Sequence, residues 1–276
     1  MKKQVTANSY GRGGINLSER FFNRYEFKYL ISEETAADFL RLVIPHMKRD
    51  QFTDENAIYR ISSLYFDTRE NLFLDEYLRE ERFRQKLRLR VYNTPNLWDT
   101  CFFEIKKKFS KYVNKRRAKI TVGEGYAWMR GERTLEEMIE KFPTEAQILR
   151  EIHFLMQLYQ LEPRVVISYN RQAFMGIFDD SLRVTFDRQL TKRHTLLEPH
   201  QRGDDLLYLP TEKVVLEVKT NKAIPLWLAG TISELECRKQ TFSKYSNSYL
   251  SPEIKVAESG KLKVEGKSSY ELEKQL

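Results

Sequence analysis

Cysteine and long apolar runs are scarce in this sequence of 276 residues. It has two cysteines, and Cys101 lies in an apolar alternation with Phe103 and Ile105. We therefore expect Cys101 and Cys237 to be free, buried thiols in a reducing compartment. No apolar run approaches the ~20 residues that a membrane helix needs. The N-terminal stretch MKKQVTANSYGRGG lacks the apolar core of a signal peptide. These absences predict a cytoplasmic protein with no membrane span in this chain.

Three common arrangements of functional residues are also missing. The glycine-containing stretches GRGGINL and GEGYAWMRG lack the Gly-Lys-Ser/Thr ending that makes a P-loop meaningful. The four histidines are dispersed without the spacing of metal ligands. No nucleophile stands beside a base in a way that indicates covalent catalysis. The sequence therefore favours a different kind of site.

Positive charge is plentiful. Lysine and arginine number 47 against 39 aspartates and glutamates, which gives a net charge of +8. Such a balance favours a polyanionic partner, which is a nucleic acid, a phosphate compound or an anionic membrane. Charge alone does not choose among the three.

Hydrophobic periodicity predicts one α+β domain at residues 21–250, between a flexible arm at 1–20 and a polar, disordered tail at 251–276. Period-2 alternation predicts strands at 24–31, 57–67, 83–92, 101–109, 111–121, 164–174, 182–190 and 213–220. Helical spacing predicts helices at 32–47, with Ser32 as the N-cap, and at 68–80, 133–160 with a break near Pro143, and 225–236.

One face of the predicted strands is unusually rich in cations. In FRQKLRLRVY (83–92), the even positions from 84 to 90 are all lysine or arginine, whereas the odd positions are mainly apolar. The pattern recurs in 24–31, 101–109 and 111–121. An antiparallel sheet with one solvated face explains any single strand. Because the pattern recurs in so many strands, the alternative is a sheet that curls and closes with helices outside. The cations would then line the lumen, and because unpaired buried charges are costly, the lumen would hold water, counter-ions or a polyanion.

Eight short motifs suggest a family: YEFKY, SLYFDT, KLRLRVY, FFEIKKK, SYNRQAF, LRVTFDRQL, LEVKT and FSKY. In this order, from about residue 22 to 250, they resemble the VTC domain, which is the polyphosphate polymerase domain of the vacuolar transporter chaperone family. The chain is similar to stand-alone members of the bacterial type. The resemblance implies the triphosphate tunnel metalloenzyme fold, a closed antiparallel β-barrel with a basic lumen and helices packed outside.

The resemblance also implies site residues. It assigns catalysis to Lys28, Arg88, Arg90 and Lys244. It assigns phosphate binding to Lys106, Lys115, Arg117, Arg171 and Arg183, although KRR leaves the register of the Lys115 and Arg117 pair uncertain by one residue. It assigns Mn²⁺ or Mg²⁺ to Glu217, with Glu104 and Glu26 as helpers. One carboxylate is enough when phosphate and water supply the other ligands.

The sequence departs from related enzymes in two ways. The related CYTH hydrolases begin with Glu-x-Glu-x-Lys, whereas this chain has Arg24-x-Glu26-x-Lys28, which argues against that hydrolase chemistry. The eukaryotic VTC proteins also carry an inositol-phosphate-sensing domain and membrane helices. Neither is found in this sequence, so a membrane partner is expected to be a separate chain.

Four functions remain open at this point. The resemblance favours a metal-dependent polymerase that makes polyphosphate from ATP. A triphosphatase acting on tripolyphosphate or a nucleoside triphosphate would bind the phosphates with the same basic residues, and water would be the attacking group. A non-catalytic module that binds polyphosphate or another polyanion needs only the cations. Nucleic acid is the weakest candidate, because the aromatic residues mostly fall on the apolar faces and form no stacking platform.

Overall fold

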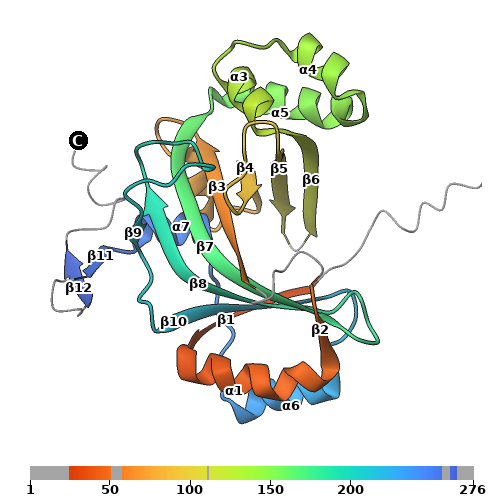
Figure 1. Cartoon of the computed structure of the whole chain (residues 1–276), viewed down its shortest axis with the longest axis vertical. Coiled ribbons are helices and arrows are strands. Elements are labelled where there is room, and N and C mark those ends of the chain that lie inside the picture. The colour runs from red at the N-terminus through yellow and green to blue at the C-terminus, as the bar shows by residue number, and fades with distance from the viewer. Residues whose placement is uncertain (1–24, 51–57, 111, 257–261, 266–276) are drawn as a thin grey trace, which may run out of the picture.

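The computed structural model describes residues 25–50, 58–110, 112–256 and 262–265. They form a strongly curved antiparallel sheet with helices on its outer side (Figure 1). The strands of the curved wall are β1 (Tyr25–Ser32), β3 (Ile58–Asp67), β4 (Phe83–Tyr92), β5 (Thr100–Phe109), β6 (Tyr112–Thr121), β7 (Glu162–Gly176), β8 (Arg183–Arg193) and β10 (Lys213–Thr220). The shorter strands are β2 (Met47–Arg49), β9 (Leu206–Leu207), β11 (Glu253–Val256) and β12 (Leu262–Glu265).

The helices lie between these strands in sequence. The α-helices are α1 (Glu33–Val43), α2 (Leu72–Leu78), α3 (Val122–Met129), α4 (Leu135–Lys141), α5 (Ala146–Tyr159), α6 (Leu226–Glu234) and α7 (Lys244–Leu250), and the 3-10 turns are η2 (Ile44–His46) and η3 (Pro143–Glu145). Ser32 is the N-cap of α1, as predicted, because its Oγ accepts a hydrogen bond of 3.0 Å from the Thr35 amide. No helix in the described part of the chain combines the length and apolar character needed to cross a bilayer.

The wall of the sheet runs in the order β6-β5-β4-β3-β7-β8-β10-β1. The predicted closure into a barrel is not found among the described strands, since β6 pairs only with β5, and β1 forms its strand ladder only with β10. The two ends of the wall nevertheless come close, because Lys106 Nζ on β5 lies 3.5 Å from Glu26 Oε2 on β1. The sheet is therefore curled but open, and a side-chain contact joins β1 to β5, the neighbour of the edge strand β6.

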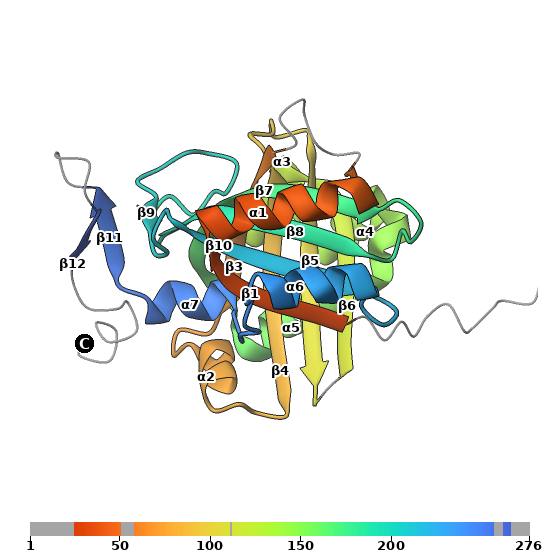
Figure 2. The same cartoon turned by 90° about the horizontal axis from the view of Figure 1, so that it is seen from below.

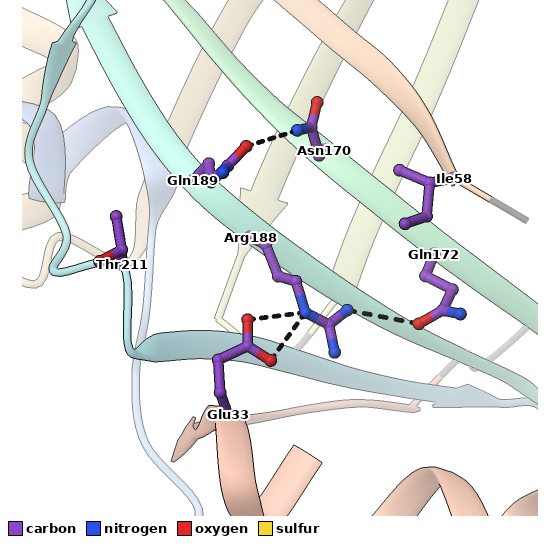
Figure 3. A pocket seen from close by; sticks show the side chains of 7 residues that line it. All are labelled: Glu33, Ile58, Asn170, Gln172, Arg188, Gln189 and Thr211. Carbon is purple, nitrogen blue, oxygen red and sulfur yellow. Dashed lines mark hydrogen bonds and ion pairs between the residues drawn. The ribbon is translucent and has the colours of Figure 1, made fainter. Parts of the chain in front are cut away.

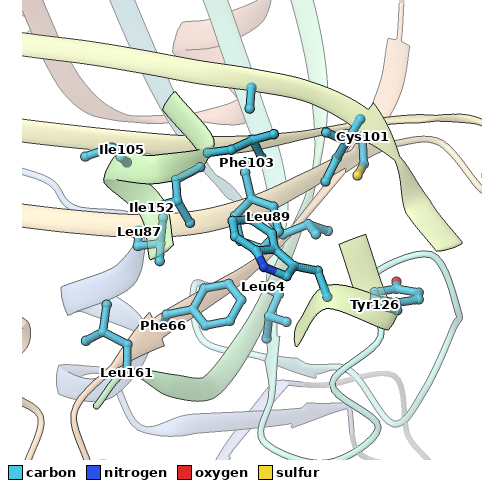
Figure 4. Packing of buried hydrophobic residues seen from close by; sticks show 14 of the residues in the cluster. Leu64, Phe66, Leu87, Leu89, Cys101, Phe103, Ile105, Tyr126, Ile152 and Leu161 are labelled. Carbon is cyan, nitrogen blue, oxygen red and sulfur yellow. The ribbon is translucent and has the colours of Figure 1, made fainter. Parts of the chain in front are cut away.

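Apolar residues cover the outer face of the wall in two separate clusters. In the first, Leu87, Leu89 and Phe103 pack beneath α3, α4 and α5 (Figure 4). In the second, Phe186 and Leu216 pack against α1 and α6, which lie across β8, β10 and β1 (Figure 2). A third cluster, which includes Tyr65, Tyr169 and Tyr245, gathers around α7. The opposite, inner face of the wall carries the alternating charged residues, together with wall residues of this third cluster such as Tyr65 and Tyr169.

Three differences from the predicted elements have physical causes. Helix α3 was not predicted, because its sequence VGEGYAWM contains two glycines, which weaken helical propensity. Helix α7 was not predicted either, and its serines and asparagine are poor helix formers. Within the predicted polar tail, β11 pairs with β9 and β12, and Ile254 is 5% exposed. The predicted arm at 1–20 and Arg24 lie outside the described residues.

Candidate functional site

Period-2 alternation places the predicted site residues of the strands on the inner face of the wall, and Lys244 reaches that face from α7. They are Lys28 on β1, Arg88 and Arg90 on β4, Glu104 and Lys106 on β5, Lys115 and Arg117 on β6, Arg171 on β7, Arg183 on β8, Glu217 on β10 and Lys244 at the start of α7, with Glu26 beside Lys28. Most of these side chains form two clusters, each centred on buried carboxylates.

Glu217 is the centre of the first cluster. It is 3% exposed, and its Oε2 lies 2.6 Å from Lys219 Nζ and 3.4 Å from Arg171 Nη2. Its Oε1 lies 2.9 Å from Lys244 Nζ and 3.8 Å from Lys28 Nζ. Burial alone would raise the pKa of Glu217, but these four cations outweigh it and hold the pKa well below its ordinary value. Glu217 is therefore ionised and serves as an internal counter-ion.

Asp187 is a second buried acid in this cluster, and no pattern in the sequence predicts its role. Its two oxygens accept paired 2.6 Å hydrogen bonds from Arg171, and Oδ2 lies 2.5 Å from Lys244 Nζ. Burial opposes ionisation of Asp187, but Arg171 and Lys244 lower its pKa. In the same way, Asp187 and Glu217 raise the pKa of Lys244 against the effect of burial. Lys244 therefore stays charged although it is only 8% exposed.

Glu104 is the centre of the second cluster, on β4, β5 and β6. Arg88 Nη2 and Lys115 Nζ each lie 2.6 Å from its carboxylate, and Arg90 Nε lies 3.7 Å away. Burial opposes ionisation of Glu104, but these three cations hold its pKa far below the ordinary value. Arg88 also donates a 2.9 Å hydrogen bond to Tyr65 Oη. The repulsion expected between Arg88 and Arg90 is thus relieved by a carboxylate placed beside both.

Glu26 connects the two ends of the wall. It contacts Lys106 of β5, and its Oε1 lies 3.3 Å from Lys219 Nζ and 3.8 Å from Lys28 Nζ. Burial would raise the pKa of Glu26, but the lysines lower it strongly. Lys28 and Lys219 are shared between Glu26 and Glu217, so the carboxylates of the first cluster form one continuous network with the cations.

Strand pairing settles the uncertain register of the KRR stretch. Arg117 is directly opposite Glu104, and Lys115 is opposite Lys106, so both predicted residues face inward. Arg116 points to the outer face, where its Nη2 lies 2.8 Å from Glu151 Oε1. Arg117 lies over the Phe102 ring, with its guanidinium carbon 4.8 Å from the ring centroid.

Arg183 and Lys86 also lie on the inner face, where burial and neighbouring cations lower the pKa of Lys86. Arg183 Nη2 contacts Asp50 at 2.5 Å and Tyr59 Oη at 3.2 Å, so it belongs to neither carboxylate cluster. Lys86, which was noted in the cationic pattern but assigned no role, donates a 2.6 Å hydrogen bond to Ser243 Oγ. Its ammonium group also lies 4.8 Å from the centroid of the Tyr77 ring. The inner face therefore extends to the start of α7.

The resemblance implies a divalent ion at Glu217 that takes most of its ligands from phosphate and water. The described residues contain no group of three His, Cys, Asp or Glu side chains suited to a metal. However, Thr185 is directly opposite Glu217 on β8, is fully buried, and has a hydroxyl without a hydrogen-bond partner in the described structure. An orphaned hydroxyl beside a carboxylate is consistent with an additional oxygen ligand at this position.

The lowered pKa values give a testable pH dependence. Above the ordinary glutamate value of 4.5, Glu217 and Glu104 are ionised in both the folded and the unfolded chain, and their stabilisation is complete. As the pH falls below about 4.5, the unfolded chain binds protons that the folded chain does not, so the free energy of unfolding falls. Urea unfolding between about pH 7 and about pH 3 measures this slope. A free energy that stays constant through this range would contradict these pKa values.

A cavity of about 260 Å³ lies away from the inner face. It is lined by Arg188, Asn170 and Gln172, which point to the opposite side of the sheet from Arg171 and Asp187 (Figure 3). The Arg188 guanidinium is already paired with Glu33 at 2.8 Å. This cavity contains none of the predicted site residues, so it is not part of the candidate site.

Two solved structures of proposed cyclases are similar to part of this chain. One is an adenylyl cyclase from Hippeastrum with a dominant triphosphatase activity, at 14% identity and a TM-score of 0.46, covering 80% of this chain and 92% of that one. The other is an adenylate cyclase from Bacillus halodurans, at 13% identity and a TM-score of 0.43, covering 80% and 95% of the two chains.

Sequence comparison identifies the family. Vacuolar transporter chaperone complex subunit 4 from Trypanosoma cruzi is 26% identical over 86% of this chain and 35% of its own length. The protein of the same name from Trypanosoma brucei brucei is 26% identical over 86% of this chain and 36% of its own length. The chain thus spans about a third of the length of these relatives. Residues 23–252 match the VTC domain, and the chain therefore belongs to the VTC domain family.

Proposed function

We propose that the protein is a metal-dependent phosphotransferase that makes polyphosphate from ATP on its inner face, in the cytoplasm. The observation that supports this most directly is the surplus of inward cations over the carboxylates that neutralise them. Arg88, Arg90 and Lys115 share Glu104, while Lys28, Arg171, Lys219 and Lys244 share Glu217, Asp187 and Glu26. A surface built in this way suits a ligand with many negative oxygens.

The proposed chemistry needs positioning and charge more than a reactive side chain. Arginine forks and lysines hold the non-bridging phosphate oxygens and stabilise the charge that develops on them. Each charge-assisted hydrogen bond contributes roughly 1.5–3 kcal/mol. A terminal phosphate oxygen of the growing chain attacks the γ-phosphorus of ATP, the bond from that phosphorus to the β,γ-bridging oxygen breaks, and ADP leaves. A divalent ion held by Glu217 would supply further neutralisation of phosphate charge.

One incubation tests this proposal. Purified protein is mixed with ATP and either Mn²⁺ or Mg²⁺, and the products are separated on a gel that resolves polyphosphate from orthophosphate. A ladder of polyphosphate is the expected result. Orthophosphate without a ladder would overturn polymerisation in favour of a triphosphatase, in which water replaces the phosphate end as the attacking group.

A thermal shift series tests the binding half of the proposal. A ligand present at 100 times its Kd stabilises the folded state by about 2.7 kcal/mol. For a chain of this size, that corresponds to a rise in Tm of roughly 5–10 °C with tripolyphosphate. A rise in Tm without any turnover would indicate a polyanion-binding module. An unchanged Tm together with no turnover would overturn the proposed function as a whole.

A further inference from the structure

Asp67 is a buried acid that the proposed chemistry does not use. It is fully buried at the end of β3. Its Oδ1 accepts 2.8 Å hydrogen bonds from the amides of Thr68 and Phe73, and its Oδ2 accepts one of 3.0 Å from the Leu74 amide. The fourth donor is the Tyr245 hydroxyl, 2.5 Å from Oδ2. Asp67 therefore joins the first turn of α2 to the first turn of α7.

Tyr245 is held on two sides. Its hydroxyl reaches Asp67, and its ring stacks on the Tyr65 ring at a centroid distance of 5.1 Å and an interplanar angle of 20°. Tyr65 in turn accepts the hydrogen bond from Arg88. The residue before Tyr245 in α7 is Lys244, whose ammonium group reaches Asp187 and Glu217. One short segment thus contacts both a structural carboxyl group and the carboxylates of the inner face.

Helix α7 depends on such contacts for its position. It has seven residues, and helices this short are marginal on their own in water. Its sequence KYSNSYL is also poor in strong helix formers. The place of Lys244 is therefore determined by what α7 contacts rather than by the helix itself.

We propose that Asp67 and Tyr245 are positioning residues that set Lys244 on the inner face through the Asp67–Tyr245 hydrogen bond. This inference rests on the proposed function of Lys244 as a phosphate contact. Neither Asp67 nor Tyr245 needs to touch the phosphate chain. Tyr245→Phe keeps the stacked ring and removes only the hydroxyl, so it loosens α7 while preserving the packing around it.

Limited acylation with acetic anhydride tests the positioning without any ligand. Peptide mass spectrometry reports how fast each lysine is labelled, and Lys244 is only 8% exposed in the parent. We expect Tyr245→Phe to raise the labelling rate of Lys244 about tenfold. A hydrogen bond to a carboxylate changes the equilibrium constant between docked and undocked α7 by about that factor. Asp67→Asn should act in the same direction. Lys219, which lies outside α7, is the internal reference.

Tyr208→Phe is the matched control. Tyr208 is 1% exposed in the same cluster as Tyr245, and its hydroxyl has no hydrogen-bond partner in the described structure. Its variant should leave the labelling of Lys244 unchanged. Unchanged labelling of Lys244 in Tyr245→Phe would overturn the inference, as would an equal rise at Lys219, which would indicate general loosening. If Asp67→Asn does not fold, Tyr245→Phe still decides the result.

A double-mutant cycle then separates positioning from a general structural effect. Tyr245→Phe should weaken tripolyphosphate binding in calorimetry, but it should have no further effect in a Lys244→Met background. Equal weakening in both backgrounds would show that Tyr245 does not act through Lys244, and so would overturn the inference. A parent protein that does not bind tripolyphosphate would refute the proposed function, while the acylation result would still decide the positioning.

Discussion

Replacing Glu217 with glutamine is expected to abolish phosphoryl transfer while tripolyphosphate binding becomes tighter. Glu217 is the proposed ligand of the divalent ion, so its loss should lower kcat at least about a hundredfold, as does the loss of a preorganised electrostatic contact. Glu217 also competes with phosphate for Lys219 and Lys244, which lie 2.6 and 2.9 Å from it. Its neutral replacement leaves those cations available to the ligand. Turnover and calorimetric binding measure the two effects separately.

Glu26→Gln is the control for this result. Glu26 shares Lys28 and Lys219 with Glu217, but its side chain is 29% exposed and has no contact with Lys244 in the described structure. Its loss should therefore reduce turnover much less. Parent-like turnover of Glu217→Gln at saturating Mn²⁺ would show that the metal is held elsewhere. Weaker tripolyphosphate binding in that variant would show that Glu217 does not compete with phosphate.

Glu104→Gln is expected to destabilise the ligand-free protein by about 3–5 kcal/mol, the usual result of removing one partner from a buried ion pair. The variant leaves Arg88, Arg90 and Lys115 without their shared counter-ion on the inner face. Tripolyphosphate can replace that negative charge, so it should raise the Tm of the variant more than the Tm of the parent. Chemical unfolding with and without tripolyphosphate measures both quantities.

The outer face of the same strands offers a matched control in Glu151. It lies on α5, 2.8 Å from both Lys107 Nζ and Arg116 Nη2, which belong to β5 and β6. Glu151→Gln also removes a carboxylate shared by cations, but on the side away from the site. Its tripolyphosphate-induced shift should equal that of the parent. If the two glutamine variants show the same shift, the inner face has no special role in anion binding.

The strands and the polarity of their faces could be predicted because side chains alternate with a period of two. Once 83–92 is a strand, Arg88 and Leu89 lie on its opposite faces in any tertiary arrangement. Closure of the sheet could not be predicted in this way, because alternation is the same in an open and in a closed wall. The elements that were missed, α3 and α7, owe their form to burial of residues such as Tyr126 and Tyr245 rather than to local propensity.

The candidate site was predictable where charge and strand position coincided. Asp187 and Thr185 stood on the charged side of 182–188, yet a single acid or a threonine among cations does not indicate a role until the neighbouring strands are known. Pairing of β8 with β10 places Thr185 opposite Glu217, and pairing with β7 places Asp187 opposite Arg171. Asp67 stood in the SLYFDT motif, where an acid just before a predicted helix indicates capping of that helix. Its link to Tyr245 spans 178 positions of sequence, so no local pattern predicts it.

The division of the outer apolar surface into two clusters has a consequence for folding cooperativity. The cluster beneath α3–α5 and the cluster beneath α1 and α6 are held together by the hydrophobic effect, each within its own part of the wall. Between them, the third cluster around α7 adds apolar contacts, and the contact between Lys106 and Glu26 adds an electrostatic one. Native-state hydrogen exchange should therefore resolve two units that open with different free energies. An anion that bridges the inner face would bring those free energies together, so that the two units unfold as one.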